Sequence, residues 1–70
     1  HRRQREAKVL AALQRAGHGT PETLVAEVYA DTPAFLHLAA RLSLQAHLIH
    51  LVESGQALFR DGTWHALTAV

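Results

Sequence analysis

The sequence predicts a small, mainly α-helical fold with a single β-hairpin. The chain has 70 residues, of which 49% are hydrophobic and 19% charged, a balance typical of a folded domain. Apolar residues recur at helical spacing in three segments, and an Asp-Gly dipeptide near the C-terminal end marks a tight turn. A chain of this length forms one domain, residues 1–70, with a modest core.

The first helix is expected over residues 3–16. The segment is rich in good helix formers, and its apolar positions fall at helical spacing: Val9, Leu10, Leu13 and Ala16. Gly17 follows as a stop signal. The arginine-rich start would lie at the positive end of the helix dipole, which disfavours a helix that begins there. We therefore expect this helix to continue backwards into a segment that precedes residue 1.

The second helix is expected over residues 21–30. Thr20 can cap it, and Pro21 suits the first helical position. Thr32-Pro33 repeats the same start for a third helix. Two helices joined by such a short turn favour a helix-turn-helix geometry.

The third helix, residues 33–54, carries two apolar stripes on different sides of its cylinder. The first half has Phe35, Leu38, Ala39 and Leu42, and the second half has Leu44, Leu48, Leu51 and Val52. Either the helix is covered on two sides, or it breaks near residues 41–43, where Ser43 could cap a second piece. One continuous helix is favoured, and Gly55 ends it.

A hairpin is expected over residues 57–67, with its turn at Asp61-Gly62. This turn would pair Arg60 with Thr63, and Phe59 with Trp64. A lone hairpin is unstable in water, so it must pack on the helices. Three helices followed by a hairpin make a winged helix, with the hairpin as the wing.

Composition and charge narrow the possible functions. The chain has no cysteine, which excludes disulfides and thiolate metal sites and fits a cytoplasmic protein. No apolar run approaches the length that spans a bilayer. The net charge of +1 is unevenly distributed: residues 1–8 have four basic side chains against one acidic, +3, and residues 20–55 have one basic against four acidic, −3.

Several blocks together resemble a known family. They are the opening HRRQRE, with His1, Arg2, Arg5 and Glu6; the block Val28, Tyr29, Asp31, Thr32 and Pro33; and the block Ala46, His47, Leu48, Leu51 and Gly55. In this order, they resemble the C-terminal winged-helix domain of metallo-β-lactamase-fold hydrolases. The chain is similar in particular to the tail of the lactamase-B-like endoribonuclease branch.

The resemblance implies an accessory domain of a larger hydrolase. Enzymes of that superfamily hold one or two zinc ions through an HxHxDH motif and further ligands, and this chain has no such motif. The resemblance therefore implies no cofactor in this chain and zinc in a missing catalytic domain of the same polypeptide. It further implies that the chain packs on that domain and shapes substrate access or dimerisation, with a homodimer possible. The substrate could be RNA, a thioester or another ester.

His47 and His50 lie three residues apart, a spacing at which a helix can present two metal ligands. Glu53 could be a third ligand, but the sequence shows no further residues that would complete a metal site. We therefore predict no metal site, and expect both histidines at partly exposed polar positions or in contact with a neighbouring domain. No catalytic residue is assigned either, since Ser43 and Ser54 lack a nucleophile context.

The alternative function is a winged-helix nucleic-acid-binding module or small transcription regulator. Such a domain contacts bases through the start of its third helix, where Arg, Lys, Asn or Gln side chains form hydrogen bonds with base edges. Residues 34–41 offer only Arg41 of these, so sequence-specific DNA binding is not expected.

The predicted working surface has two parts. The first is basic, and would make interdomain contacts or steer an acidic or RNA substrate: His1, Arg2, Arg3, Arg5 and Lys8. The second is a possible interface of apolar and histidine side chains: Phe35, Leu36, His37, His47 and His50.

Overall fold

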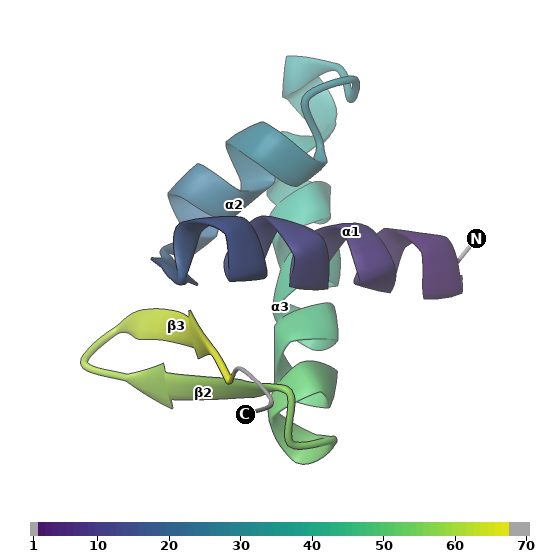
Figure 1. The fold of residues 1–70 in the computed structure, drawn as a ribbon. Helices are drawn as coiled ribbons and strands as arrows, with labels where there is room; N and C mark the ends of the chain where they lie inside the picture. The colour runs from purple at the N-terminus through teal and green to yellow at the C-terminus, as the bar shows by residue number, and fades with distance from the viewer. Residues whose placement is uncertain (1, 68–70) are drawn as a thin grey trace.

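The computed structural model confirms a winged helix of three α-helices and a small antiparallel sheet. It describes the backbone of residues 2–67 and the side chains of residues 4–67. In chain order the elements are α1 (Arg2–Ala16), β1 (His18–Gly19), α2 (Pro21–Val28), the 3₁₀ turn η1 (Ala34–Leu36), α3 (His37–Glu53), β2 (Ala57–Arg60) and β3 (Thr63–Ala66). In Figure 1, α1 crosses α3 at a steep angle, α2 lies beside one half of α3, and the hairpin lies beside the other half.

The start of α2 follows from its sequence. The Thr20 hydroxyl accepts a hydrogen bond from the Thr23 amide at 3.4 Å, and the Thr23 hydroxyl accepts one from the Thr20 amide at 3.1 Å. This reciprocal capping box satisfies two amides at the helix start, and Pro21 follows as the first helical residue. The helix ends at Val28, two residues earlier than expected.

The start of the third helix differs from the prediction. Thr32 does not cap it: Pro33 precedes a 3₁₀ turn without any side-chain cap, and α3 begins only at His37. Instead, the Thr32 carbonyl accepts a hydrogen bond from His37 Nε2 at 3.0 Å, which closes the turn. No side chain of η1 is buried, so packing does not hold these residues in α-helical geometry.

From His37 onward α3 is continuous to Glu53. Ser43 lies inside it and caps nothing, so the alternative of a break near residues 41–43 is wrong. Gly55 follows the helix with φ 80°, a conformation that glycine adopts without strain, as expected of a helix stop.

The hairpin has the predicted turn and register. Asp61 and Gly62 both have positive φ, 53° and 75°, as a two-residue type I′ turn requires. Phe59 pairs with Trp64, and Arg60 with Thr63. The sheet also contains a strand that the sequence did not reveal. The two residues of β1 pair with β3 to give the order β1-β3-β2, and so tie the connection after α1 to the wing.

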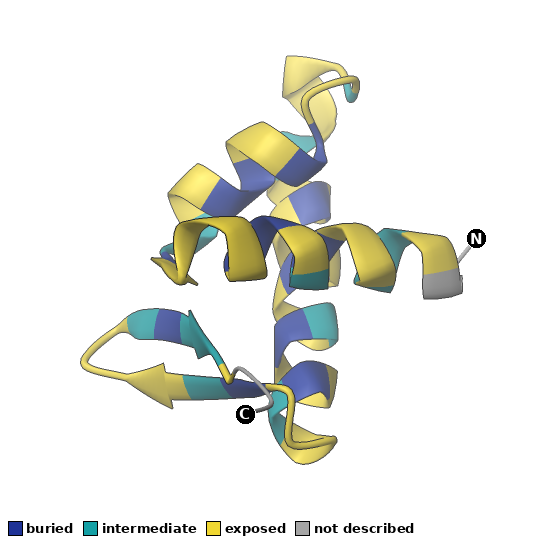
Figure 2. Cartoon of the chain, in the orientation of Figure 1, coloured by how far each residue is buried: buried dark blue, intermediate teal, exposed yellow. Residues whose placement is uncertain are grey.

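The core lies where the helices cross and the sheet closes one end (Figure 2). Every α-helix and the sheet contribute buried apolar side chains: Val9, Ala12, Leu13, Leu24, Val25, Val28, Tyr29, Ala40, Leu44, Leu48, Leu51, Ala57 and Trp64. None of the described helices is long and apolar enough to cross a membrane.

Candidate interaction surface

The outer side of α3 and the 3₁₀ turn η1 before it are apolar and exposed, with Phe35 and Leu36 in η1 and Leu38, Leu42 and Ile49 on α3. Phe35, Leu38 and Leu42 keep 83%, 77% and 68% of their surface open to solvent. Leu36 and Ile49 are less exposed, at 43% and 45%. Soluble monomers rarely leave so many large apolar side chains exposed on adjoining elements, so this side of η1 and α3 is the strongest candidate for a contact surface.

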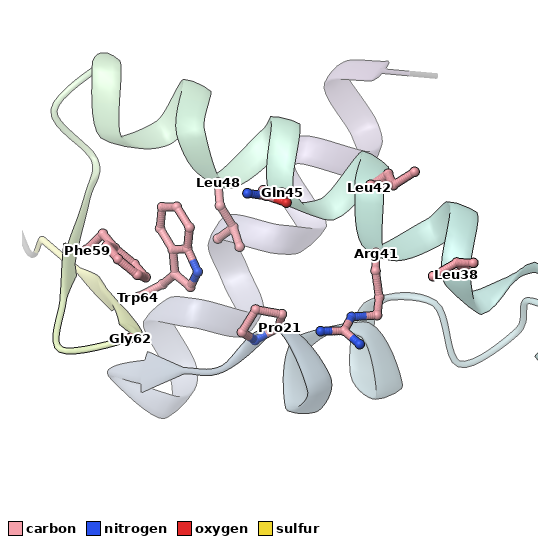
Figure 3. A pocket seen from close by; sticks show the side chains of 9 residues that line it. All are labelled: Pro21, Leu38, Arg41, Leu42, Gln45, Leu48, Phe59, Gly62 and Trp64. Carbon is pink, nitrogen blue, oxygen red and sulfur yellow. The ribbon is translucent and has the colours of Figure 1, made fainter.

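A groove runs beside these residues, between α3, the start of α2 and the hairpin (Figure 3). Its volume is about 340 Å³. Its lining is mostly apolar: Pro21, Leu38, Leu42, Leu48, Phe59, Gly62 and Trp64, with Arg41 and Gln45 as the polar members. Phe59 and Trp64 lie at one end with ring centroids 4.5 Å apart, and the tilt of 50° between them is typical of a favourable aromatic pair.

The polar edge of the groove is charge-balanced. Arg41 Nη2 lies 2.9 Å from Glu22 Oε1, and both side chains are exposed. The pKa of the Glu22 carboxyl is lowered mainly by a hydrogen bond with the backbone amide of Glu22 itself, and the positive charge of Arg41 lowers it further. Arg41 is the one basic side chain among residues 34–41, and it is therefore already neutralised within the domain.

The two predicted helix histidines share a partner from another helix. His47 Nδ1 lies 3.3 Å from Glu6 Oε1, and His50 Nδ1 lies 2.8 Å from Glu6 Oε2. Partial burial raises the pKa of Glu6, but the hydrogen bonds from His50 and His47 outweigh it, so the net pKa is lowered. The carboxylate thus joins α1 to α3, and Glu53 takes no part in this cluster. Among the described residues, no group of three His, Asp or Glu side chains is arranged to hold a metal ion.

The predicted basic surface is partly used inside the domain. Arg5 Nη1 donates to the Val28 carbonyl at 3.2 Å, and its Cζ lies 4.6 Å from the centroid of the Tyr29 ring. This cation–π contact fixes Arg5 over α2. Burial raises the pKa of Tyr29, with Arg5 opposing, and the buried Tyr29 hydroxyl has no hydrogen-bond partner among the side chains and backbone that the structure describes. Lys8 is exposed, while His1 and the side chains of Arg2 and Arg3 lie outside the described residues.

The five predicted interface residues have different surroundings in the structure. Phe35 and Leu36 are exposed, His37 closes the turn before α3, and His47 and His50 form hydrogen bonds with Glu6. Leu38, Leu42 and Phe59 are exposed as well, although they are not among the residues that the sequence predicts for the interface. The spacing of the first two with Phe35 was visible in the sequence, whereas Phe59 needed the sheet to show which face of the hairpin packs on the core.

The fold and the groove define a winged-helix domain whose third helix presents apolar rather than basic side chains. Residues 20–64 match the family model of the beta-lactamase associated winged helix domain, and the chain belongs to that family. The match covers α2, α3 and the wing up to Trp64. No solved structure matches the chain.

Proposed function

We propose that this chain is a non-catalytic accessory domain of a metallo-β-lactamase-superfamily hydrolase, and that it packs on the catalytic domain and shapes substrate access or dimerisation. The exposed apolar side of α3, in a family of winged helices associated with β-lactamase-type domains, is the observation that carries the proposal. Burying such a surface against a partner is favourable because each large apolar side chain covered contributes roughly 1–2 kcal/mol.

The proposed contacts divide between the two ends of the domain. Phe35 and Leu36 project from the turn before α3 and are free to enter a partner's surface. Lys8 and the basic start of α1, including His1, Arg2 and Arg3, would face the catalytic domain or steer an acidic substrate toward it. Arg5, His47 and His50 would act there indirectly, by holding α1 against the rest of the domain.

The finer parts of the proposal concern the rest of the polypeptide. A preceding catalytic domain would supply the zinc ligands, including an HxHxDH motif that this chain lacks. The blocks resembling the lactamase-B-like endoribonuclease branch make RNA the first substrate to try, ahead of thioesters and other esters. A cytoplasmic location belongs to the same proposal.

The test uses the natural polypeptide that carries this chain. Its segment preceding His1 should contain HxHxDH, and the purified protein should contain zinc by mass spectrometry. Phe35→Glu should lower kcat/KM several-fold on an RNA, thioester or ester substrate while the zinc content stays unchanged. Glu27→Gln, which changes a charge on the exposed side of α2, is the matched control and should leave kcat/KM as it is. A natural polypeptide without the motif would overturn the proposal.

A nucleic-acid-binding module is the second candidate, and the basic start of α1 is the observation in its favour. Filter binding of the chain to duplex DNA and single-stranded RNA separates the two candidates. Salt-sensitive binding to duplex DNA at micromolar or lower concentration would favour the regulator, because phosphate contacts dominate such affinity.

A further inference from the structure

Two histidines face each other across the sheet, from strands that lie far apart in the sequence. His18 of β1 pairs in register with His65 of β3, and the centroids of their rings lie 6.0 Å apart with an angle of 49° between the ring planes. Side chains directly opposite each other on antiparallel strands point to the same face of the sheet. The two rings therefore share one face, where His18 is exposed and His65 is partly exposed.

The three other described histidines are already used inside the domain. They form hydrogen bonds with the Thr32 carbonyl or with the carboxylate of Glu6. His18 and His65 contact each other instead, and neither forms a hydrogen bond with the residues that the structure describes. Their ring nitrogens are therefore available to a ligand.

The backbone holds the two histidines in position. The Ala66 amide donates a hydrogen bond to the Gly17 carbonyl at 3.0 Å, one residue beyond the pair on each strand. On its other side β3 pairs with β2, so His65 belongs to the central strand of the sheet. Side chains on paired strands are held more precisely than side chains on loops, and a ligand that binds both rings meets a preorganised site.

The separation of the rings fits a single metal ion. Neutral imidazole nitrogen is a common ligand of Cu²⁺, Ni²⁺ and Zn²⁺. With nitrogen–metal bonds of about 2.0–2.1 Å, two imidazoles on one ion have ring centroids about 4.5–6.4 Å apart, depending on the angle at the metal. The observed separation of 6.0 Å lies within this range, so one ion can reach both rings without a change in the backbone.

We propose that His18 and His65 form a binding site for a divalent transition-metal ion, and that Cu²⁺ binds there more tightly than Ni²⁺ or Zn²⁺. This order follows from the affinity of nitrogen ligands along the first-row metals. Two protein ligands are fewer than those of a closed metal centre, so water or a donor from a partner completes the coordination. The site lies apart from the Glu6 cluster and does not depend on the zinc proposed for the catalytic domain.

An ion bound in this way would connect two parts of the fold. The strand β1 directly follows α1, and β3 belongs to the wing, so the ion ties the end of α1 to the hairpin. The two rings come together only when the sheet is formed, and binding therefore favours the folded state. We expect the midpoint of thermal unfolding to rise with the concentration of Cu²⁺.

Titration with Cu²⁺ tests the site. The chain is used with an acetylated amino terminus, because the free amine and the imidazole of His1 would together chelate Cu²⁺. Isothermal titration should show one ion per chain at the tightest site, with micromolar affinity, and electron paramagnetic resonance should show two imidazole nitrogens on that ion. His18→Gln and His65→Gln should each bind Cu²⁺ at least about tenfold more weakly, because the second bond of a two-ligand site forms within one molecule.

The matched control is His50→Gln, which removes an exposed histidine that Glu6 already binds and should leave the affinity for Cu²⁺ unchanged. Circular dichroism checks that each variant keeps its helices, and the spectrum of the unmodified chain tests the site even where a variant does not fold. Equal affinity in the unmodified chain, His18→Gln and His65→Gln would mean an adventitious ion only and would overturn the proposal. A spectrum with a single imidazole nitrogen would overturn it as well. Either result leaves the zinc and activity test of the proposed function intact.

Discussion

The two sides of α3 carry the same kinds of side chain in opposite surroundings. Leu44, Leu48 and Leu51 are at most 1% exposed, whereas Leu38 and Leu42, on the same helix, are more than two-thirds exposed. Intrinsic helix preference and hydrophobicity do not distinguish the two sets. The difference arises from what the rest of a 70-residue chain can cover: α1, α2 and the hairpin pack on one side and leave the other open. A stripe that this domain does not cover is available to a partner.

The largest change in stability is expected for Leu48→Ala, on the buried side of α3. Leu48 is fully buried in the middle of the core, so the substitution leaves a cavity and should lower the free energy of unfolding by about 2–5 kcal/mol. Urea denaturation followed by circular dichroism measures it. A loss below about 1 kcal/mol would mean that the buried side of α3 is not packed at core density.

A smaller loss of stability is expected on the polar side of α3, where His47 and His50 contact Glu6 of α1. The variant that tests this contact is Glu6→Gln. The amide keeps the shape but removes the charge that His47 and His50 bind, which should cost about 1 kcal/mol near neutral pH. Since the folded-state pKa of Glu6 lies below its ordinary value of 4.5, its ionised form stabilises the fold above that pH. That contribution is lost as the pH falls below 4.5 through the lowered folded value.

Unfolding free energies measured from pH 7 downward therefore test the Glu6 cluster. The difference between the unmodified chain and Glu6→Gln should shrink as the solution becomes acidic. Glu27→Gln is the matched control, because its exposed ion pair with Arg15 should contribute less than about 0.5 kcal/mol. A difference that is independent of pH would show that the two histidines do not interact with the charge of Glu6.

The hairpin repeats the contrast of α3 on a smaller scale. Trp64 is buried, while its cross-strand neighbour Phe59 is half exposed at one end of the groove. Phe59→Ala removes an aromatic pair but no core side chain, so it should cost about 0.5–1 kcal/mol in thermal or urea unfolding. A cost near that of Leu48→Ala would place Phe59 in the core after all.

The smallest expected effect is that of Leu42→Ala. At protein concentrations where the chain is monomeric, the free energy of unfolding should change by less than about 0.5 kcal/mol, because the side chain makes little contact inside the domain. Comparison with Leu48→Ala under the same conditions gives the full contrast between two leucines of one helix. Equal losses for the two variants would remove the case for an open stripe.

The sequence predicted most elements because their signals are local. The Thr20-Pro21 start of α2, the Asp61-Gly62 turn and the pairing of Phe59 with Trp64 each follow from adjacent residues, and all are present in the structure. Thr32-Pro33 carries the same local signal, but the prediction that it starts an α-helix is wrong. The three residues that follow form a 3₁₀ turn with no buried side chain, so packing on the core does not hold them in an α-helix.

What the sequence could not predict depends on residues far apart in the chain. Glu6 meets His47 and His50 across 41 and 44 positions, a distance at which no local pattern operates. The pairing of β1 with β3 involves only two residues, too few for a periodic signal. The two stripes of α3 were visible beforehand, but only the packed domain shows which of them is buried.

The arrangement of α1 has a consequence for local motion. Val9 is the first buried side chain of the described chain, so the first two turns of α1 have no apolar anchor in the core. Arg5 and Glu6 hold these turns through their contacts with Val28, Tyr29, His47 and His50. The amides of these turns should therefore exchange with deuterium by local opening, well before those around Leu13. Losing the Glu6 carboxylate would let this end of α1 fray while the remainder of the domain stays folded.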